Sequence, residues 1–138
     1  HRKDIPAQLE EIGHGQVDYV LCLNSTDSHW NTMTKVVAPQ GHICSIVETS
    51  APVDIRPLMG KSATFSWELM FTRPMFGTPD MIEQHRLLNE VANLVDSGKL
   101  RTTTGEVVGS IDAANLRKAH AQIESGRAIG KLVLEGWY

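Results

Sequence analysis

The sequence has little that would place it among disulfide-rich, nucleic-acid-binding or membrane-spanning proteins. Its two cysteines in 138 residues make no disulfide framework and favour a reducing compartment. Its 13 Lys and Arg are outnumbered by 16 Asp and Glu, so the clustered positive charge of a nucleic-acid binder is missing. No apolar run approaches the roughly 20 residues of a membrane span, and no apolar signal segment follows the basic residues 1–3. We therefore expect a cytoplasmic protein without nucleic-acid or membrane partners.

Glycine-rich phosphate-binding motifs are missing as well. The triplet at 60–62 (GKS) ends like a P-loop, but Ile55 stands where the first glycine of that motif belongs. The triplet at 13–15 (GHG) begins like a dinucleotide fingerprint, but Asp18 occupies the position of the third glycine. The six histidines are scattered without an HxxxH pair, and there is no CxxC, so the spacing indicates no zinc site.

What the sequence does contain is an alternation of strand-like and helix-like segments. Apolar runs at 17–23 and 42–47 predict strands, and apolar spacing over residues 30–37 predicts a helix between them, followed by turn residues at 39–41. A third strand is predicted at 61–67. Unbroken apolar runs are typical of parallel strands covered on both faces, so this part predicts an α/β fold with a mostly parallel sheet.

The rest of the chain continues the same pattern. The further predicted elements are a helix over 5–12 with Asp4 as N-cap, a helix from the N-cap Thr78 with Pro79 at its first position to Gly98, a strand at 100–108, a helix from Ser110 or Asp112 to Gly126, and a strand at 131–134.

Ligands of open parallel sheets bind outside the carboxyl ends of the strands. The loops at 24–27 and 48–53 follow two of the predicted strands, so the sequence indicates a site there without naming its ligand. The aromatic residues Trp67, Phe71 and Phe76 allow two interpretations, because they suit either a core or the wall of an apolar pocket.

Three segments together carry a family resemblance: 67–76 (WELMFTRPMF), 87–103 (LLNEVANLVDSGKLRTT) and 119–136 (AHAQIESGRAIGKLVLEG). They resemble the C-terminal part of zinc-type alcohol dehydrogenase-like proteins, in the quinone-oxidoreductase-like branch of the medium-chain dehydrogenase/reductase superfamily. The strands around 18–23 and 38–43 match the same branch, and the resemblance extends over essentially the whole chain.

The resemblance implies an incomplete domain. Residues 1–98 would form the C-terminal half of a Rossmann-type nucleotide-binding sheet with flanking helices, and residues 99–138 the C-terminal tail that in relatives packs on the catalytic domain. Because the chain begins with His1, we expect further residues upstream, with the glycine fingerprint and any zinc ligands among them.

The resemblance also implies an NAD(P)H-dependent oxidoreductase, with NADPH favoured, acting on a small alcohol or carbonyl, a quinone or an enone. The residues that it places near the cofactor are Leu23, Asn24, Ser25, Ile46, Val47, Glu48, Trp67, Phe71, Arg127 and Lys131. For Glu48 and Lys131 the alternative is a solvated strand end. No catalytic residue and no zinc ligand is assigned to this chain.

A second interpretation is a non-catalytic α/β interaction or oligomerisation module, because a sheet that lacks its first half exposes a strand edge. In the superfamily, the strand equivalent to 61–67 often pairs across a two-fold axis, so the resemblance implies a homodimer. We expect the isolated chain to be inactive.

Overall fold

The computed structural model describes residues 4–136. The chain divides into two compact units, one ending at Thr78 and one beginning at Pro79. The domain boundary implied by the resemblance, between residues 98 and 99, remains a prediction. None of the helices in residues 4–136 combines the length and the apolar character that crossing a bilayer would take.

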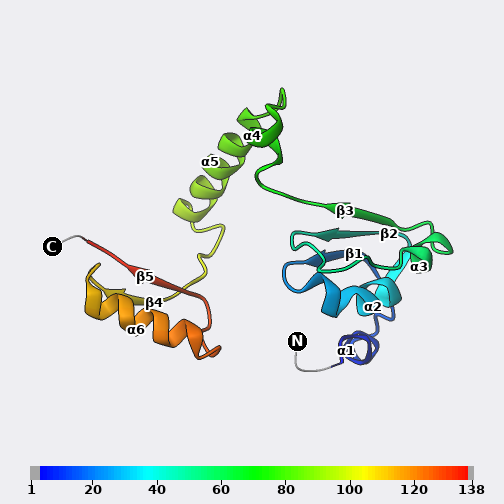
Figure 1. Cartoon of the computed structure of the whole chain (residues 1–138), viewed down its shortest axis with the longest axis horizontal. Coiled ribbons are helices and arrows are strands. Elements are labelled where there is room, and N and C mark those ends of the chain that lie inside the picture. The colour runs from blue at the N-terminus through cyan, green and yellow to red at the C-terminus, as the bar shows by residue number, and fades with distance from the viewer. Residues whose placement is uncertain (1–3, 137–138) are drawn as a thin grey trace. The chain divides into compact units, whose positions relative to one another are not determined.

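The first unit is built on a three-stranded parallel sheet in the order β1-β2-β3 (Figure 1). Val20 of β1 lies opposite Ile43 of β2, which confirms the prediction that these two apolar runs are parallel neighbours. The elements of the unit are α1 (Ile5–Glu11), β1 (Val17–Cys22), α2 (Thr26–Val36), β2 (Val37–Ser45), α3 (Arg56–Met59), β3 (Thr64–Trp67) and α4 (Thr72–Phe76).

The core of this unit lies between the sheet and α2. Trp30 of α2 meets Phe65 of β3 edge to face at 5.2 Å between ring centroids, and its Nε1 donates a 2.9 Å hydrogen bond to the Asp54 carbonyl oxygen. A buried tryptophan is thus both packed and satisfied. The buried cluster consists of Cys22, Trp30, Met33, Val37, Ile43 and Leu58.

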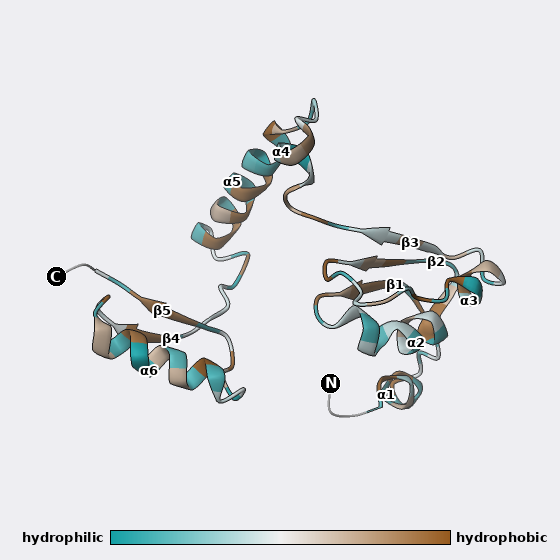
Figure 2. Ribbon diagram, viewed as in Figure 1, coloured by the Kyte–Doolittle hydropathy of each residue, from teal (hydrophilic) through white to brown (hydrophobic). Residues whose placement is uncertain are grey.

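The opposite face of the sheet corrects one prediction. Side chains alternate between the two faces of a strand, and the unit covers only the face that packs on α2. On the other face Tyr19 is 78% and Leu21 63% exposed, and the Tyr19 ring stacks on His42 at 5.5 Å. Figure 2 shows that β1 and β2 carry mainly apolar residues along their length. Burial on both faces is therefore not achieved within this unit.

The predicted turn before β2 lies inside that strand. Val37, expected on the helix, is the first residue of β2 and pairs with Val17. The next pair joins Tyr19 to His42, so β2 carries extra residues between the two pairs. Gly41 lies in this irregular stretch, where a Cβ would come within 2.9 Å of a carbonyl oxygen of β1. The turn residues 39–41 thus form a bulge-like irregularity in the pairing of β1 with β2, and they do not end a helix.

Lys61 was predicted in a strand, but it closes the C-terminal end of α2. Its Nζ donates hydrogen bonds to the carbonyl oxygens of Thr34 at 2.9 Å, Lys35 at 2.8 Å and Val37 at 2.7 Å. The last carbonyl groups of a helix have no hydrogen-bond partner within the helix. A positive charge at this end also interacts favourably with the negative end of the helix dipole. The third strand consequently begins only at Thr64.

The second unit contains a βαβ motif. The parallel strands β4 (Thr104–Gly109) and β5 (Lys131–Leu134) are joined by α6 (Ala113–Glu124), and α5 (Ile82–Asp96) precedes them. The structure selects Asp112 as the N-cap of α6, where its carboxylate accepts a 2.8 Å hydrogen bond from the Asn115 N–H. This bond lowers the pKa of Asp112.

The predicted start of α5 at Thr78 is wrong. Gly77 adopts the left-handed conformation with φ 57°, and the Thr78 N–H donates to the Arg73 carbonyl oxygen at 3.1 Å. This is the pattern that ends a helix, so Thr78 terminates α4, an element that the sequence interpretation missed. Pro79 lies in a turn, and α5 begins at Ile82.

We expect Lys61→Met to destabilise the chain by about 2 kcal/mol, because the carbonyls at the end of α2 lose a charged donor. The matched control is Lys35→Met, which removes the same charge from the same helix end but at an exposed side chain. Urea unfolding followed by tryptophan fluorescence measures both. Equal losses for the two variants would contradict the capping role.

We expect α6 to lose protection at acid pH. The pKa of Asp112 is lower in the folded state than in the unfolded state. Its carboxylate therefore stabilises the folded helix at a pH above the unfolded-state pKa, and this stabilisation is lost as the pH falls through the folded-state pKa. Asp112→Asn keeps a good N-cap without the titrating group. In amide exchange of α6, the advantage of the wild type over Asp112→Asn should shrink between about pH 6 and about pH 3. A constant difference would refute this.

Candidate functional site

The carboxyl ends of the three parallel strands lie at one edge of the sheet. Cys22 lies opposite Ser45, and Ser45 lies opposite Trp67. The three loops that follow these residues therefore start side by side. This register brings together predicted cofactor residues from three separate loops of the sequence, namely Leu23, Asn24, Ser25, Ile46, Val47, Glu48 and Trp67.

Two buried hydroxyls, which we call the hydroxyl pair, connect these loops. Thr26 begins α2 and Ser45 ends β2, and both are fully buried. Their Oγ atoms lie 2.6 Å apart, and Thr26 also donates to the Val47 carbonyl oxygen. The Ser45 hydroxyl reaches the same carbonyl oxygen at 3.4 Å, and either hydroxyl can be the donor in the bond between the two. The pair thus holds the loop after β2 against the start of α2.

The loop after β1 is held in an unusual conformation. Ser25 is left-handed, with φ 47° and ψ 62°, and its Oγ donates to the Asn24 side-chain oxygen at 3.1 Å. The left-handed region costs a non-glycine residue about 1 to 2 kcal/mol. Such a conformation persists where the surroundings fix it, and it is frequent at functional sites.

A cavity of about 190 Å³, the end cavity, opens between the ends of β2 and β3. It is lined by Ile46, Glu48, Trp67, Glu68 and Leu69. Three of these were predicted near the cofactor, whereas Glu68 and Leu69 were not singled out. The Trp67 ring is half exposed and stands edge-on to Phe65 at 4.9 Å, which fixes one wall of the cavity.

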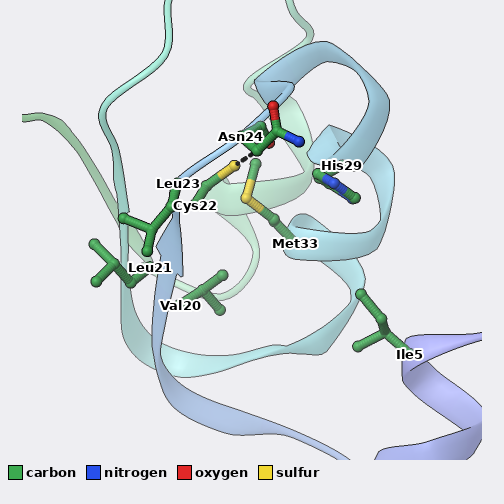
Figure 3. A pocket seen from close by; sticks show the side chains of 8 residues that line it. All are labelled: Ile5, Val20, Leu21, Cys22, Leu23, Asn24, His29 and Met33. Atoms are coloured by element: carbon green, nitrogen blue, oxygen red, sulfur yellow. Dashed lines mark hydrogen bonds between the residues drawn. The ribbon is translucent and has the colours of Figure 1, made fainter. Parts of the chain in front are cut away.

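A second cavity of about 310 Å³, the edge cavity, lies beside β1 (Figure 3). Four consecutive residues from Val20 to Leu23 line it. Because consecutive residues alternate between faces, this cavity follows the outer edge of the strand. Asn24 and His29 supply its polar groups, and the Cys22 thiol donates to the Asn24 carbonyl oxygen at 3.3 Å.

Five predicted residues lie outside both cavities. Ser25 and Val47 belong to the loops after β1 and β2 but line neither cavity. Phe71 precedes α4 and is 55% exposed. Arg127 and Lys131 are exposed residues of the second unit, Arg127 in the turn after α6 and Lys131 at the start of β5. The Lys131 N–H donates to the Thr103 carbonyl oxygen at 2.7 Å, a backbone role in the βαβ motif. The approach of Arg127 and Lys131 to a cofactor remains a prediction.

A metal-ligand cluster is not found in the described part of the chain. Within residues 4–136, no group of three or more His, Cys, Asp and Glu side chains could hold a metal ion. The candidate site is therefore made of loop backbone, hydroxyls, two glutamates and a tryptophan.

The hydroxyl pair was missed by the sequence interpretation. Thr26 was read as part of a polar loop, and Ser45 as one residue of an apolar strand. The sequence did contain one indication of the pair. Ser45 is a polar residue on the same, inward-facing side of the strand 42–47 as Ile43. A buried polar side chain needs a partner, and only the fold identifies Thr26 as that partner.

Comparison with known proteins agrees with the resemblance. A family model described as zinc-binding dehydrogenase matches residues 2–134. A zinc-type alcohol dehydrogenase-like protein of Staphylococcus aureus (strain MSSA476) is 40% identical over 134 residues, which cover 97% of this chain and 40% of that protein. A protein of the same description from Staphylococcus epidermidis (strain ATCC 12228 / FDA PCI 1200) is 37% identical over the same shares.

Solved structures show the same architecture. A protein assigned as a zinc-dependent alcohol dehydrogenase, from Rhizobium etli CFN 42, superposes with a TM-score of 0.84 at 48% identity, covering 100% of this chain and 40% of that one. A quinone oxidoreductase of Pseudomonas syringae pv. Tomato DC3000, with a TM-score of 0.68 and 20% identity over 98% of this chain and 41% of its own, shares the fold. The chain thus spans about 40% of the length of the curated relatives it matches. It belongs to the zinc-binding dehydrogenase family and corresponds to the C-terminal part of its medium-chain dehydrogenase/reductase-type relatives.

Proposed function

We propose that this chain forms the nicotinamide-side part of an NAD(P)-dependent oxidoreductase, with NADPH as the favoured cofactor. The parent enzyme would transfer hydride between the cofactor and a small alcohol or carbonyl, a quinone or an enone. The supporting observation is the parallel register, which brings three loops implied in cofactor contact to one sheet edge. Membership of a dehydrogenase family supports the reaction class.

The described residues fit one end of such a cofactor. The end cavity, at about 190 Å³, is smaller than the roughly 300 Å³ typical of complete small-molecule sites. It suits a single ring, with Trp67 against the ring face and backbone groups of residues 46–48 beside its polar substituent. When bound, the nicotinamide supplies the hydride, and the protein supplies orientation and exclusion of water. Ile46 and Leu69, both half exposed in this chain, would form the apolar wall of the end cavity.

The remainder of the cofactor and any zinc would rest on residues outside this chain. The sequence has no glycine fingerprint for the pyrophosphate. Among the described residues, no group of side chains could hold a zinc ion. Phe71, Arg127 and Lys131 would complete the cofactor environment only in the assembled parent.

The experiment is a hydride-transfer assay on the full-length protein that carries this chain. Nicotinamide absorbance should fall in the presence of a quinone or an enone, faster with NADPH than with NADH. Trp67→Ala should raise the KM for NADPH about tenfold because a ring contact is lost, whereas Phe76→Ala, an exposed aromatic outside the end cavity, should not. The isolated chain should bind NADPH no tighter than about 1 mM. Tight stoichiometric binding by the isolated chain, or no transfer by the full-length protein, would refute the proposal.

A second candidate function, an oligomerisation module, is favoured by the sheet itself. β1 and β3 are the outer strands of the three-stranded sheet, and an unpaired strand edge invites pairing with another chain. Tyr19 and Leu21 add an exposed apolar face. We propose a homodimer formed through β3, which is compatible with either function.

Sedimentation equilibrium tests the dimer. The chain should sediment at twice its mass of 15.3 kDa, and Thr64→Lys, which places a charge on the edge strand, should weaken association. Thr102→Lys adds the same charge in an exposed loop and is the matched control. A wild-type monomer at every concentration would exclude dimerisation of this chain.

A further inference from the structure

We propose that Thr26 is a positioning residue: its buried hydroxyl fixes the orientation of the peptide group between Val47 and Glu48, and thereby the backbone that faces the end cavity. The positioning of a cofactor rests on the proposed function, whereas the coupling between α2 and the loop after β2 is a property of this chain alone.

The first observation is where the hydroxyl bonds are directed. The side chain of Thr26 is fully buried at the start of α2, yet its hydroxyl bonds to the Val47 carbonyl oxygen, beyond the end of β2. The Ser45 hydroxyl supports this contact from the strand end at 2.6 Å. The bonds therefore cross from one loop of the site to the other and do not merely complete a helix.

The second observation is that the same helical turn holds the loop at another point. The Asp27 carboxylate accepts two hydrogen bonds of 3.0 Å, from the N–H and from the hydroxyl of Ser50. Thr26 and Asp27 thus hold the loop on both sides of Glu48, a residue that lines the end cavity. The first turn of α2 determines the course of this loop.

The geometry of the peptide bond carries the effect to the cavity. In a planar trans peptide, the carbonyl and the following N–H point in opposite directions. Because the Val47 carbonyl points to Thr26, the Glu48 N–H points away from α2. Loss of the Thr26 hydroxyl leaves this carbonyl with only the longer contact of 3.4 Å from the Ser45 hydroxyl, so the orientation of the peptide is held less firmly.

Packing alone does not require a hydroxyl at this position. Thr26→Val keeps the packing but leaves the Ser45 hydroxyl and the Val47 carbonyl oxygen each with one hydrogen-bond partner fewer. A valine fills almost the same volume as threonine, so the distinctive effect of Thr26 is its bond to Val47. A positioning role therefore predicts that the hydroxyl, and not the volume, matters.

The experiment compares Thr26→Val and Thr26→Ser with the matched control Thr34→Val. Thr34 is a second buried threonine of α2, but its hydroxyl bonds only within the helix, to the Asn31 carbonyl oxygen at 3.2 Å. In the full-length protein that carries this chain, Thr26→Val should raise the KM for NADPH about tenfold while kcat changes less than about threefold. Thr26→Ser and Thr34→Val should stay within about twofold of the wild type.

A second readout needs no activity. In amide exchange on the isolated chain, Thr26→Val should speed exchange of residues 47–50 about tenfold, and Thr26→Ser and Thr34→Val should not. If the wild-type full-length protein transfers no hydride, the proposed function fails, and the exchange data still decide the coupling. Should Thr26→Val not fold, Ser45→Ala tests the same coupling, because it removes the hydroxyl that supports the Thr26–Val47 bond with little change of volume, and it should speed exchange of residues 47–50.

Three results would overturn the inference. Unchanged amide exchange of residues 47–50 in Thr26→Val would show that the Thr26 hydroxyl does not couple α2 to the loop after β2. Faster exchange with an unchanged KM leaves Thr26 a structural residue. A Thr26→Ser variant as impaired as Thr26→Val shows that the hydroxyl alone does not position the loop.

Discussion

Parallel pairing of β1 with β2 and of β2 with β3 is the constraint on which the candidate site depends. Parallel strands end at the same edge of a sheet, so Cys22, Ser45 and Trp67 start their loops side by side. The Thr26 and Ser45 hydroxyls then link the loop after β2 to the start of α2. Backbone pairing selects which residues meet, and two buried side chains determine how the loop is oriented.

The same sheet also explains why a longer protein is expected. Three parallel strands covered on one face leave Tyr19 and Leu21 exposed, and β1 has an unpaired edge beside the edge cavity. Parallel sheets are normally covered on both faces. These open surfaces agree with a chain that spans about 40% of the length of the relatives it matches. The end cavity, at about 190 Å³, is likewise smaller than a complete small-molecule site.

Sequence interpretation succeeded where one local rule acted alone and failed where two competed. The Asp4 cap was predicted, and Asp112 was one of two predicted starts of α6, because an N-cap needs only a side chain and the next turn. Thr78 and Pro79 looked equally convincing, but Gly77 makes Thr78 the end of α4. Lys61 matched a strand pattern, whereas its charge is used by carbonyls of a helix that lies more than twenty residues earlier. Contacts across such separations leave no local pattern.

The sequence by itself determined the alternation of elements and the apolar runs that pair in parallel, because hydrophobic periodicity and turn residues are local properties. The ligand site at the carboxyl ends of the strands was predicted from that alternation. The sequence also carried the family resemblance. Only the tertiary structure decided that Ser45 and Thr26 are partners, that Glu68 and Leu69 line the end cavity, and that Phe71 does not. Those facts depend on strand register and on the path of each loop, which are set by the packing of the whole unit.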